Sequence, residues 1–312
     1  MHLSWHPQID LSAFHTAWCC ASFPQRTEHC APPVRSAAGT LSDVVLRLNT
    51  AAAGASSAGS ATPTAKLTVS QSFWHLLFAF APHEPTTESL TKRLCSNLPL
   101  GVSPVLHAEL VPALQACKDA FREAFPKYVD EMPLRIGPLQ ALWEAQGPGL
   151  LRMTGKQTTP DLLAEAAHIY LVQPILGGSG YPTLRSNAVH FEGVMTNEVQ
   201  GLPETLRLSW LLAQLDFERP VYSELINRWR LRTVASLAML PASLAAGEEL
   251  DLCRLDLATL SAAMDAWLPD LAQTNLPSPN VAAEVVMTWW ETFIGSQPAW
   301  TTALTGLDRM LD

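Results

Sequence analysis

Three pairs of a hydroxyl residue followed by proline constrain the fold more than any other feature of the chain. The pairs are Ser103-Pro104, Thr159-Pro160 and Ser278-Pro279. A Ser or Thr side chain caps the free N–H groups at the start of a helix. Proline fits the first helical position, where its missing N–H is not needed. Each pair is therefore expected to begin a helix, and a chain with several such starts favours a multi-helix fold.

Apolar residues recur at helical spacing from about residue 70 onward. We expect helices over residues 71–81, 87–97, 104–125, 136–146, 160–173, 203–216, 221–246, 256–267, 279–294 and 298–311. The helix at 203–216 is apolar nearly all round and should be central. A Gly-rich stretch at 176–182 interrupts the helices. The predicted fold class is mainly α: an irregular multi-helix globular domain with a Gly-rich central loop and a poorly ordered N-terminal extension.

The first 66 residues differ in character from the rest. Residues 1–35 show neither a clean helical nor a clean strand period, and residues 51–62 contain only Ala, Gly, Ser and Thr. Such small side chains cannot bury enough apolar area to offset the entropy of ordering them. We therefore expect residues 1–66 to be a flexible or loosely ordered extension with an Ala/Ser/Gly linker, and residues 67–312 to be a helical globular domain.

Charge argues against several classes of partner. The formal net charge is −9, and no run of Lys and Arg counters it. Such a chain repels phosphate backbones and anionic lipid, so neither a nucleic-acid nor a membrane partner is expected. Residues 1–11 contain no Lys, no Arg and no sustained apolar run, and we expect a cytoplasmic location. Charged residues make up 16% and hydrophobic residues 48%, which favours a large buried core.

Two Glu and two His form a candidate transition-metal site. Glu165 and His168 would share a face of the expected helix at 160–173. His190 and Glu192 would share a face of an extended segment. These are ligand types that transition metals accept, although a di-iron bundle would need a second Glu-x-x-His motif. The alternative is a polar helix edge beside a hydrogen-bonded core histidine.

The Gly-rich stretch is a candidate anion-binding site. It consists of Gly177, Gly178, Ser179 and Gly180, with Arg185 and Arg207 as candidate clamps. Backbone N–H groups of such loops can hold phosphate, and arginine can clamp it. The stretch matches neither a P-loop nor a dinucleotide fingerprint. The alternative is a helix C-cap followed by a tight turn.

Arg207 lies in the apolar helix expected at 203–216, so its charge should need a partner. Glu204 lies one helical turn earlier, and Glu192 lies in the preceding irregular segment. We expect a carboxylate partner and favour Glu192, because that contact would attach the Gly-rich stretch to a central helix. An exogenous anion is the alternative partner.

Residues of the kinds that bind zinc also gather near the N-terminus. They are His15, Cys19, Cys20, His29 and Cys30. Their spacing lacks the Cys-x-x-Cys pattern of structural zinc sites, which favours an incidental cluster of reduced thiols. Whether the cluster binds zinc stays open.

Three hypotheses about function remain. A Gly-x-Ser-x-Gly elbow is absent from the sequence. The leading hypothesis is a helical interaction or scaffold protein without catalytic activity, with a protein partner and no cofactor. The first alternative is a metal-dependent enzyme using Glu165, His168, His190 and Glu192. The second is a small-molecule-binding helical bundle with a pocket lined by tryptophans such as Trp210 and Trp289.

Overall fold

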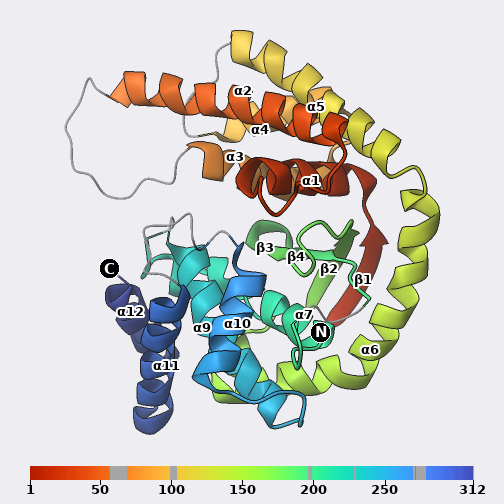
Figure 1. Ribbon diagram of the computed structural model, residues 1–312. Coiled ribbons are helices and arrows are strands. Elements are labelled where there is room, and N and C mark those ends of the chain that lie inside the picture. Colours follow the sequence, from red (N-terminus) through yellow and green to blue (C-terminus); the bar gives the residue numbers. More distant parts are fainter. Residues whose placement is uncertain are drawn as a thin grey trace. The chain divides into compact units, whose positions relative to one another are not determined.

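A computed structural model describes residues 1–56, 69–98, 104–195, 199–227, 230–269, 271 and 279–311. Helices dominate these residues and a small four-stranded sheet accompanies them (Figure 1), so the mainly α prediction is confirmed. The chain divides into two compact units. We call Pro7–Pro133 with Leu171–Leu176 the helical unit, and Met1–His6, Leu134–Tyr170 and Gly177–Asp312 the mixed unit.

The helical unit is built around its first helix. Its helices are α1 (Ile9–Ser22), α2 (Pro32–Ser56), α3 (Val69–Phe80), the short η1 (Ala81–His83), α4 (Thr87–Asn97) and α5 (Pro104–Ala124). Ten consecutive residues of α1 are buried, and the helix packs against α2, α3 and α5. A helix buried on all sides has no polar face, so its sequence lacks amphipathic periodicity.

The N-terminal segment therefore differs from the loosely ordered extension that its composition suggests. Residues 9–22 form the buried helix α1, and residues 51–56 of the Ala/Ser/Gly tract continue α2. Residues 57–62 of that tract lie outside the described residues. The chain passes from one compact unit to the other after His6, Pro133, Tyr170 and Leu176.

The mixed unit contains the sheet and the C-terminal helices. Its strands are β1 (His2–Pro7), β2 (Ala166–Val172), β3 (Gly180–Thr183) and β4 (Ala188–Glu192), in the order β1-β2-β4-β3. Its helices are α6 (Tyr128–Gln157, which begins in the helical unit), η2 (Pro160–Leu162), η3 (Leu184–Ser186), α7 (Glu204–Leu212), η4 (Leu215–Glu218), α8 (Pro220–Ser223), α9 (Leu231–Glu248), α10 (Leu257–Trp267), α11 (Pro279–Ser296) and α12 (Trp300–Met310). Strands β3 and β4 are antiparallel, with Tyr181 opposite His190.

The central position expected for the helix at 203–216 is confirmed. Every residue of α7 is buried, and the helix packs against α9 and strands β3 and β4. Trp210 is 1% exposed and donates its indole N–H to the carbonyl of Ser236. The helix is shorter than predicted, because it ends at Leu212 and η4 follows.

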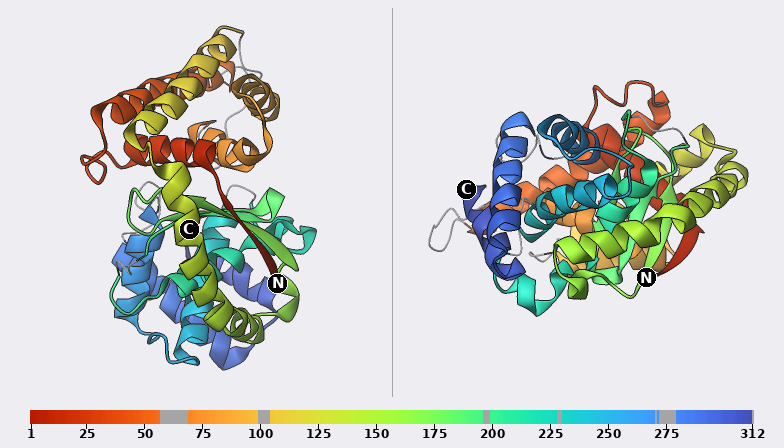
Figure 2. Two further views of the ribbon diagram at one scale, coloured as in Figure 1. Left: turned by 90° about the vertical axis from the view of Figure 1, so that its right-hand side faces the viewer. Right: turned by 90° about the horizontal axis from the view of Figure 1, so that it is seen from below.

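Two of the three hydroxyl-proline pairs mark true helix starts, since α5 begins at Pro104 and α11 at Pro279. Helices α11 and α12 lie side by side (Figure 2, blue), and Trp289 of α11 donates its indole N–H to the carbonyl of Ala303 in α12. Of the helices in the described ranges, none combines the length and the apolar character needed to cross a bilayer.

The third pair was misleading. Pro160 begins only the single turn η2, and the helix predicted at 160–173 is wrong because Ala166–Val172 is strand β2. Along the first half of this strand exposed and buried residues alternate, whereas its second half is buried on both faces. Burial on both faces removes the period of two that identifies a strand in a sequence.

Candidate functional site

The Gly-rich stretch forms a turn between β2 and β3 that binds a carboxylate of the same unit. Gly177 and Gly178 have φ values of 82° and 145°, which favour glycine. The N–H groups of Gly178 and Ser179 donate to Oε2 of Glu192 at 2.7 and 2.9 Å. Glu192 lies at the end of β4 and is fully buried. The anion of this turn is therefore a side chain of the protein itself.

Arg207, a residue of α7, belongs to the same network and is 1% exposed. Its guanidinium donates to the backbone carbonyls of Ser179 at 2.6 Å and Glu192 at 3.1 Å. It also forms an ion pair with Glu204 one turn earlier, with Nε 3.1 Å from Oε2. The expectation that Arg207 has a carboxylate partner is confirmed. The favoured partner Glu192 was wrong, because Glu192 offers its backbone carbonyl and uses its side chain on the turn.

This network leaves both proposed anion-binding elements with internal partners. Phosphate at the turn would have to displace the carboxylate of Glu192 from two N–H groups. Phosphate at Arg207 would have to displace Glu204. The side chain of Arg185 lies outside the described residues, although its backbone belongs to η3. The network is best described as a structural one that ties the turn to α7.

The four predicted metal ligands do not gather at one point. Within the described residues, no three of Glu165, His168, His190 and Glu192 bring ligand atoms within 4.8 Å of one another. Glu165 and His168 are exposed, and their shared helix face does not exist because His168 lies in strand β2. His190 is buried in β4, and its ring stacks on that of Tyr181 with centroids 5.3 Å apart.

His168 instead lies beside His6, a residue that the sequence did not single out. The two belong to neighbouring strands, and Nδ1 of His168 is 3.4 Å from Nε2 of His6. Alternating His2, Ser4 and His6 was the available signal, since alternate residues of a strand share a face. The sequence does not show that β1 pairs with β2, so the alternation in β1 could not identify His168 as the neighbour of His6.

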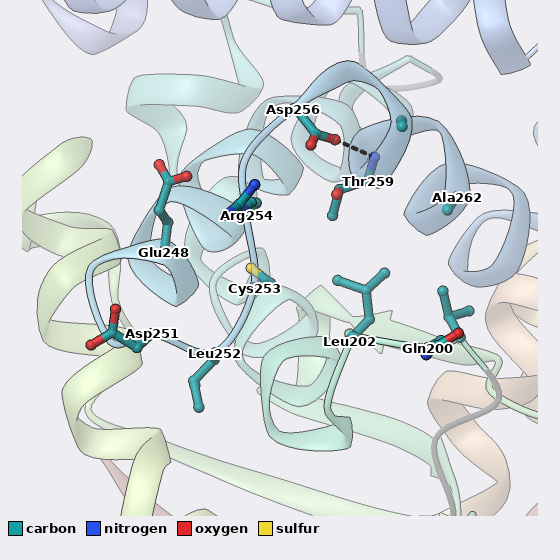
Figure 3. A pocket seen from close by; sticks show the side chains of 13 residues that line it. Gln200, Leu202, Glu248, Asp251, Leu252, Cys253, Arg254, Asp256, Thr259 and Ala262 are labelled. Atoms are coloured by element: carbon teal, nitrogen blue, oxygen red, sulfur yellow. Dashed lines mark hydrogen bonds between the residues drawn. The ribbon is translucent and has the colours of Figure 1, made fainter.

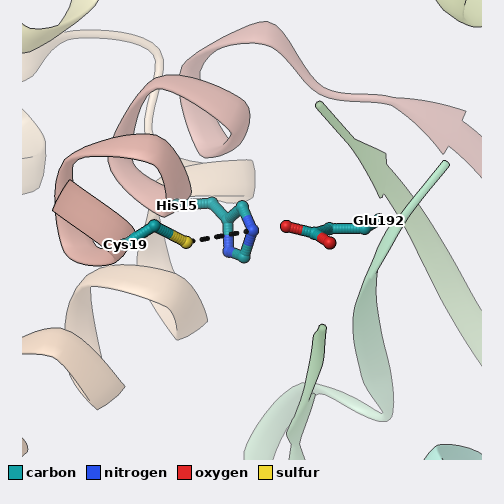
Figure 4. A group of neighbouring side chains, drawn as sticks. All are labelled: His15, Cys19 and Glu192. Carbon is teal, nitrogen blue, oxygen red and sulfur yellow. Dashed lines mark hydrogen bonds between the residues drawn. The ribbon is translucent and has the colours of Figure 1, made fainter. Parts of the chain in front are cut away.

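The N-terminal Cys and His residues form two separate groups, one of two residues and one of three. Sγ of Cys19 lies 3.5 Å from Nε2 of His15, one turn earlier in α1 (Figure 4). Cys20 forms a hydrogen bond with Cys30, which raises the pKa of Cys20 and lowers that of Cys30. His29 lies 3.8 Å from the Cys30 sulfur. Among the side chains that the structure describes, no three of these Cys and His residues bring their ligand atoms within 4.8 Å of one another.

A pocket of about 680 Å³ lies elsewhere in the mixed unit (Figure 3). Residues 199–202, the C-terminal end of α9 with the following turn, and the start of α10 line it. The carboxylates of Glu248, Asp251 and Asp256 and the guanidinium of Arg254 belong to its lining, so its charge is predominantly negative. Asp256 caps α10 by accepting the N–H of Thr259 at 2.8 Å.

Cys253 lines this pocket but is a poor nucleophile. Burial, followed by the charges of Glu248 and Asp256, raises the pKa of its thiol to about 11. The thiol donates to the carbonyl of Leu244 at 3.4 Å. Because the thiolate is the reactive form, this geometry fits a binding pocket better than thiol catalysis.

Comparison of the chain with protein-family models, with curated proteins and with solved structures finds no match. Function is therefore inferred from the residues and their geometry.

Proposed function

We propose that the chain is a helical interaction protein whose partner is a second copy of itself, bound through one face of α6. The support is an exposed, mainly apolar face on this helix, with Glu144 at its edge. Its exposed apolar residues are Leu134, Gly137, Pro138, Ala141, Leu142, Ala145 and Pro148. Leu134 is 74% and Leu142 49% exposed. Residues three, four and seven apart share a helix face, so these side chains form one apolar band about 21 Å long at about 1.5 Å per residue.

Charges at the ends of α6 favour a second copy as the occupant. The first turn contains Asp130 and Glu131, while Arg152 and Lys156 follow the apolar band near the end of the helix. In an antiparallel pair centred on Ala141, Asp130 of one copy faces Arg152 of the other. The same contact repeats by symmetry, as a two-fold interface requires. Small residues at 137, 141 and 145 let the two helix backbones approach closely.

The interface should be weak, because one helix face offers less than the about 800 Å² per partner of a standard interface. Sedimentation velocity at increasing protein concentration tests the proposal. The wild type should shift toward a dimer, whereas Ala141→Glu should stay monomeric because it places a charge at the centre of the contact. Val281→Glu is the matched control, since it adds the same charge to an exposed apolar position of α11.

A charge exchange tests the orientation. The variant Asp130→Lys with Glu131→Lys should weaken the dimer by placing like charges opposite Arg152. Adding Arg152→Glu in the same chain should restore it, because both copies then carry complementary ends again. A monomer at every concentration, or a dimer unaffected by Ala141→Glu, would refute self-association through α6.

The acid-lined pocket supports a second candidate function, the binding of a small cationic molecule. Its size is within the range of small-molecule sites, and three carboxylates outnumber one guanidinium. Spermidine serves as the probe in a thermal shift measurement. We expect the melting temperature to rise, and to rise less in Asp251→Asn, which retains a residue tolerant of the positive φ of 56° there. Asp265→Asn, on the exposed side of α10, is the control. An equal shift in both variants would refute this assignment.

A further inference from the structure

Two histidines from neighbouring strands meet in the mixed unit. His6 lies in β1 and His168 in β2, and these strands pair in the sheet. Their ring centroids are 5.5 Å apart, and Nδ1 of His168 is 3.4 Å from Nε2 of His6. His168 is exposed and His6 is half-buried. The pair is therefore preformed by the sheet and open to water.

The distance between the two nitrogens is long for a direct hydrogen bond and also fits a shared metal ion. N–H···O hydrogen bonds in proteins have donor–acceptor distances of about 2.7–3.2 Å, and the N···N contact here is 3.4 Å. Zinc binds histidine nitrogen at about 2.0–2.1 Å with tetrahedral angles, which places two ligand nitrogens about 3.3–3.4 Å apart. The observed separation matches that edge of the tetrahedron.

We propose that His6 and His168 bind a divalent transition-metal ion, with Nε2 of His6 and Nδ1 of His168 as ligands. Imidazole is a ligand for zinc, copper and nickel, and a metal at this exposed position would complete its coordination with water. Each histidine would keep its proton on the other ring nitrogen, because only the unprotonated nitrogen coordinates.

A third ring of the sheet lies beside both imidazoles. The ring of Tyr170 stacks on His168 with an interplanar angle of 8° and lies 5.7 Å from His6. The tyrosine ring thus supports both imidazoles from β2 and limits their rotation, which reduces the entropy lost on binding.

A metal ion bound by this pair would link the edge strand β1 to its neighbour β2. Strand β1 is at the edge of the sheet, and His6 and His168 are far apart in sequence. In the unfolded chain nothing holds the two imidazoles together, so the site exists only in the folded protein. Metal binding should therefore raise the melting temperature and slow amide exchange in β1, because the ion binds only the paired strands.

Isothermal titration with zinc chloride in a non-coordinating buffer tests the proposal. The wild type should bind one more zinc ion per chain than the double variant His6→Asn with His168→Asn. Either single variant should lose roughly tenfold or more in affinity for that ion, since even supporting residues of metal sites have effects of this size. His2→Asn is the matched control, because it removes an exposed histidine of the same strand.

Cobalt separates this site from the cysteines. Cobalt bound to the histidine pair should show absorption from its d orbitals without a thiolate charge-transfer band, and His168→Asn should remove it. Circular dichroism of His168→Asn checks folding, and the change of an exposed side chain should leave it intact. Equal zinc uptake by the wild type and the double variant would overturn the proposal, as would an equal loss in His2→Asn.

Discussion

The helical unit and the mixed unit both contain a buried polar centre, but the two centres differ in charge. In the helical unit the hydroxyl of Tyr128 accepts from Ser12 Oγ at 2.8 Å and from the N–H of Gln8 at 3.1 Å. It donates to the carbonyl of Leu171 at 3.0 Å, and burial raises its pKa to about 12, so it stays neutral. In the mixed unit the centre is the guanidinium of Arg207, which is permanently charged.

This difference shows how the two units meet the cost of burying polar groups. A neutral hydroxyl needs only hydrogen-bond partners, which nearby backbone and side chains supply. A buried guanidinium also needs a counter-charge, so Glu204 pairs with it and Phe191 lies against it, with Cζ 3.9 Å from the ring centroid. Loss of one partner should therefore be much more harmful in the mixed unit.

The largest effect is expected for Arg207→Met. This change leaves Glu204 buried without its counter-charge. It also removes one of the donors to each of the carbonyls of Ser179 and Glu192, which retain the backbone N–H groups of Glu192 and Val194. We expect a loss of about 3–5 kcal/mol in the free energy of unfolding, measured by urea denaturation. Glu204→Gln added to Arg207→Met should cost much less than the sum of the two single losses.

The control for that cycle is Glu192→Gln. Its amide oxygen can still accept the two N–H groups of the turn, and its backbone carbonyl is unchanged. Its coupling to Arg207→Met should therefore be smaller than that of Glu204→Gln. A larger coupling for Glu192 would show that the charge of Arg207 is balanced from β4 and not from α7.

Local signals predicted much of the helical architecture. The helix starts at Pro104 and Pro279 are correct because the preference of proline for the first helical position acts within one turn. The helix predicted at 87–97 coincides with α4, which Thr86 caps by accepting the N–H of Ser89. By contrast, the sequence did not predict α1, because a helix buried on all sides lacks amphipathic periodicity. It did not predict strand β2 either, because half of that strand is buried on both faces.

The polar centre of the mixed unit was only partly predictable. The need of Arg207 for a carboxylate follows from its position in an apolar helix, and that part was correct. The choice between Glu204 and Glu192 depends on the turn, whose two N–H groups already use the side chain of Glu192. The His6–His168 pair depends on which strands are neighbours, and a single sequence does not encode that in any local pattern.

Tyr128→Phe tests the neutral centre of the helical unit. The change removes the hydroxyl that links Ser12, Gln8 and Leu171 but leaves the ring that packs against Phe121. We expect a loss of about 1–3 kcal/mol, because the remaining polar groups are buried but uncharged. Hydrogen exchange followed by mass spectrometry should show the greatest increase in α1. A loss as large as that of Arg207→Met would erase the contrast between the two centres.

Glycines in helices give a second comparison between the two units, which concerns side-chain packing and not charge. A Cβ added at Gly147 of α6, in the mixed unit, would lie 2.3 Å from the ring of Trp143, which is itself buried. Gly147→Ala should therefore cost about 1–2 kcal/mol, because displacing a packed indole outweighs the gain in helix propensity. Urea denaturation measures the loss, and a rise in Trp143 exposure to a fluorescence quencher should accompany it.

Gly39→Ala is the matched change in the helical unit and should have the smallest effect and the opposite sign. Gly39 lies on an exposed part of α2, and a Cβ added there meets no atom within 4 Å. Alanine restricts the unfolded chain more than glycine does, so we expect a gain of about 0.4–1 kcal/mol in the free energy of unfolding. The same measurement as for Gly147→Ala gives a direct comparison of the two signs. A loss at Gly39 would mean that this face of α2 is covered in solution, and equal signs at both positions would show that propensity, not packing, determines the response.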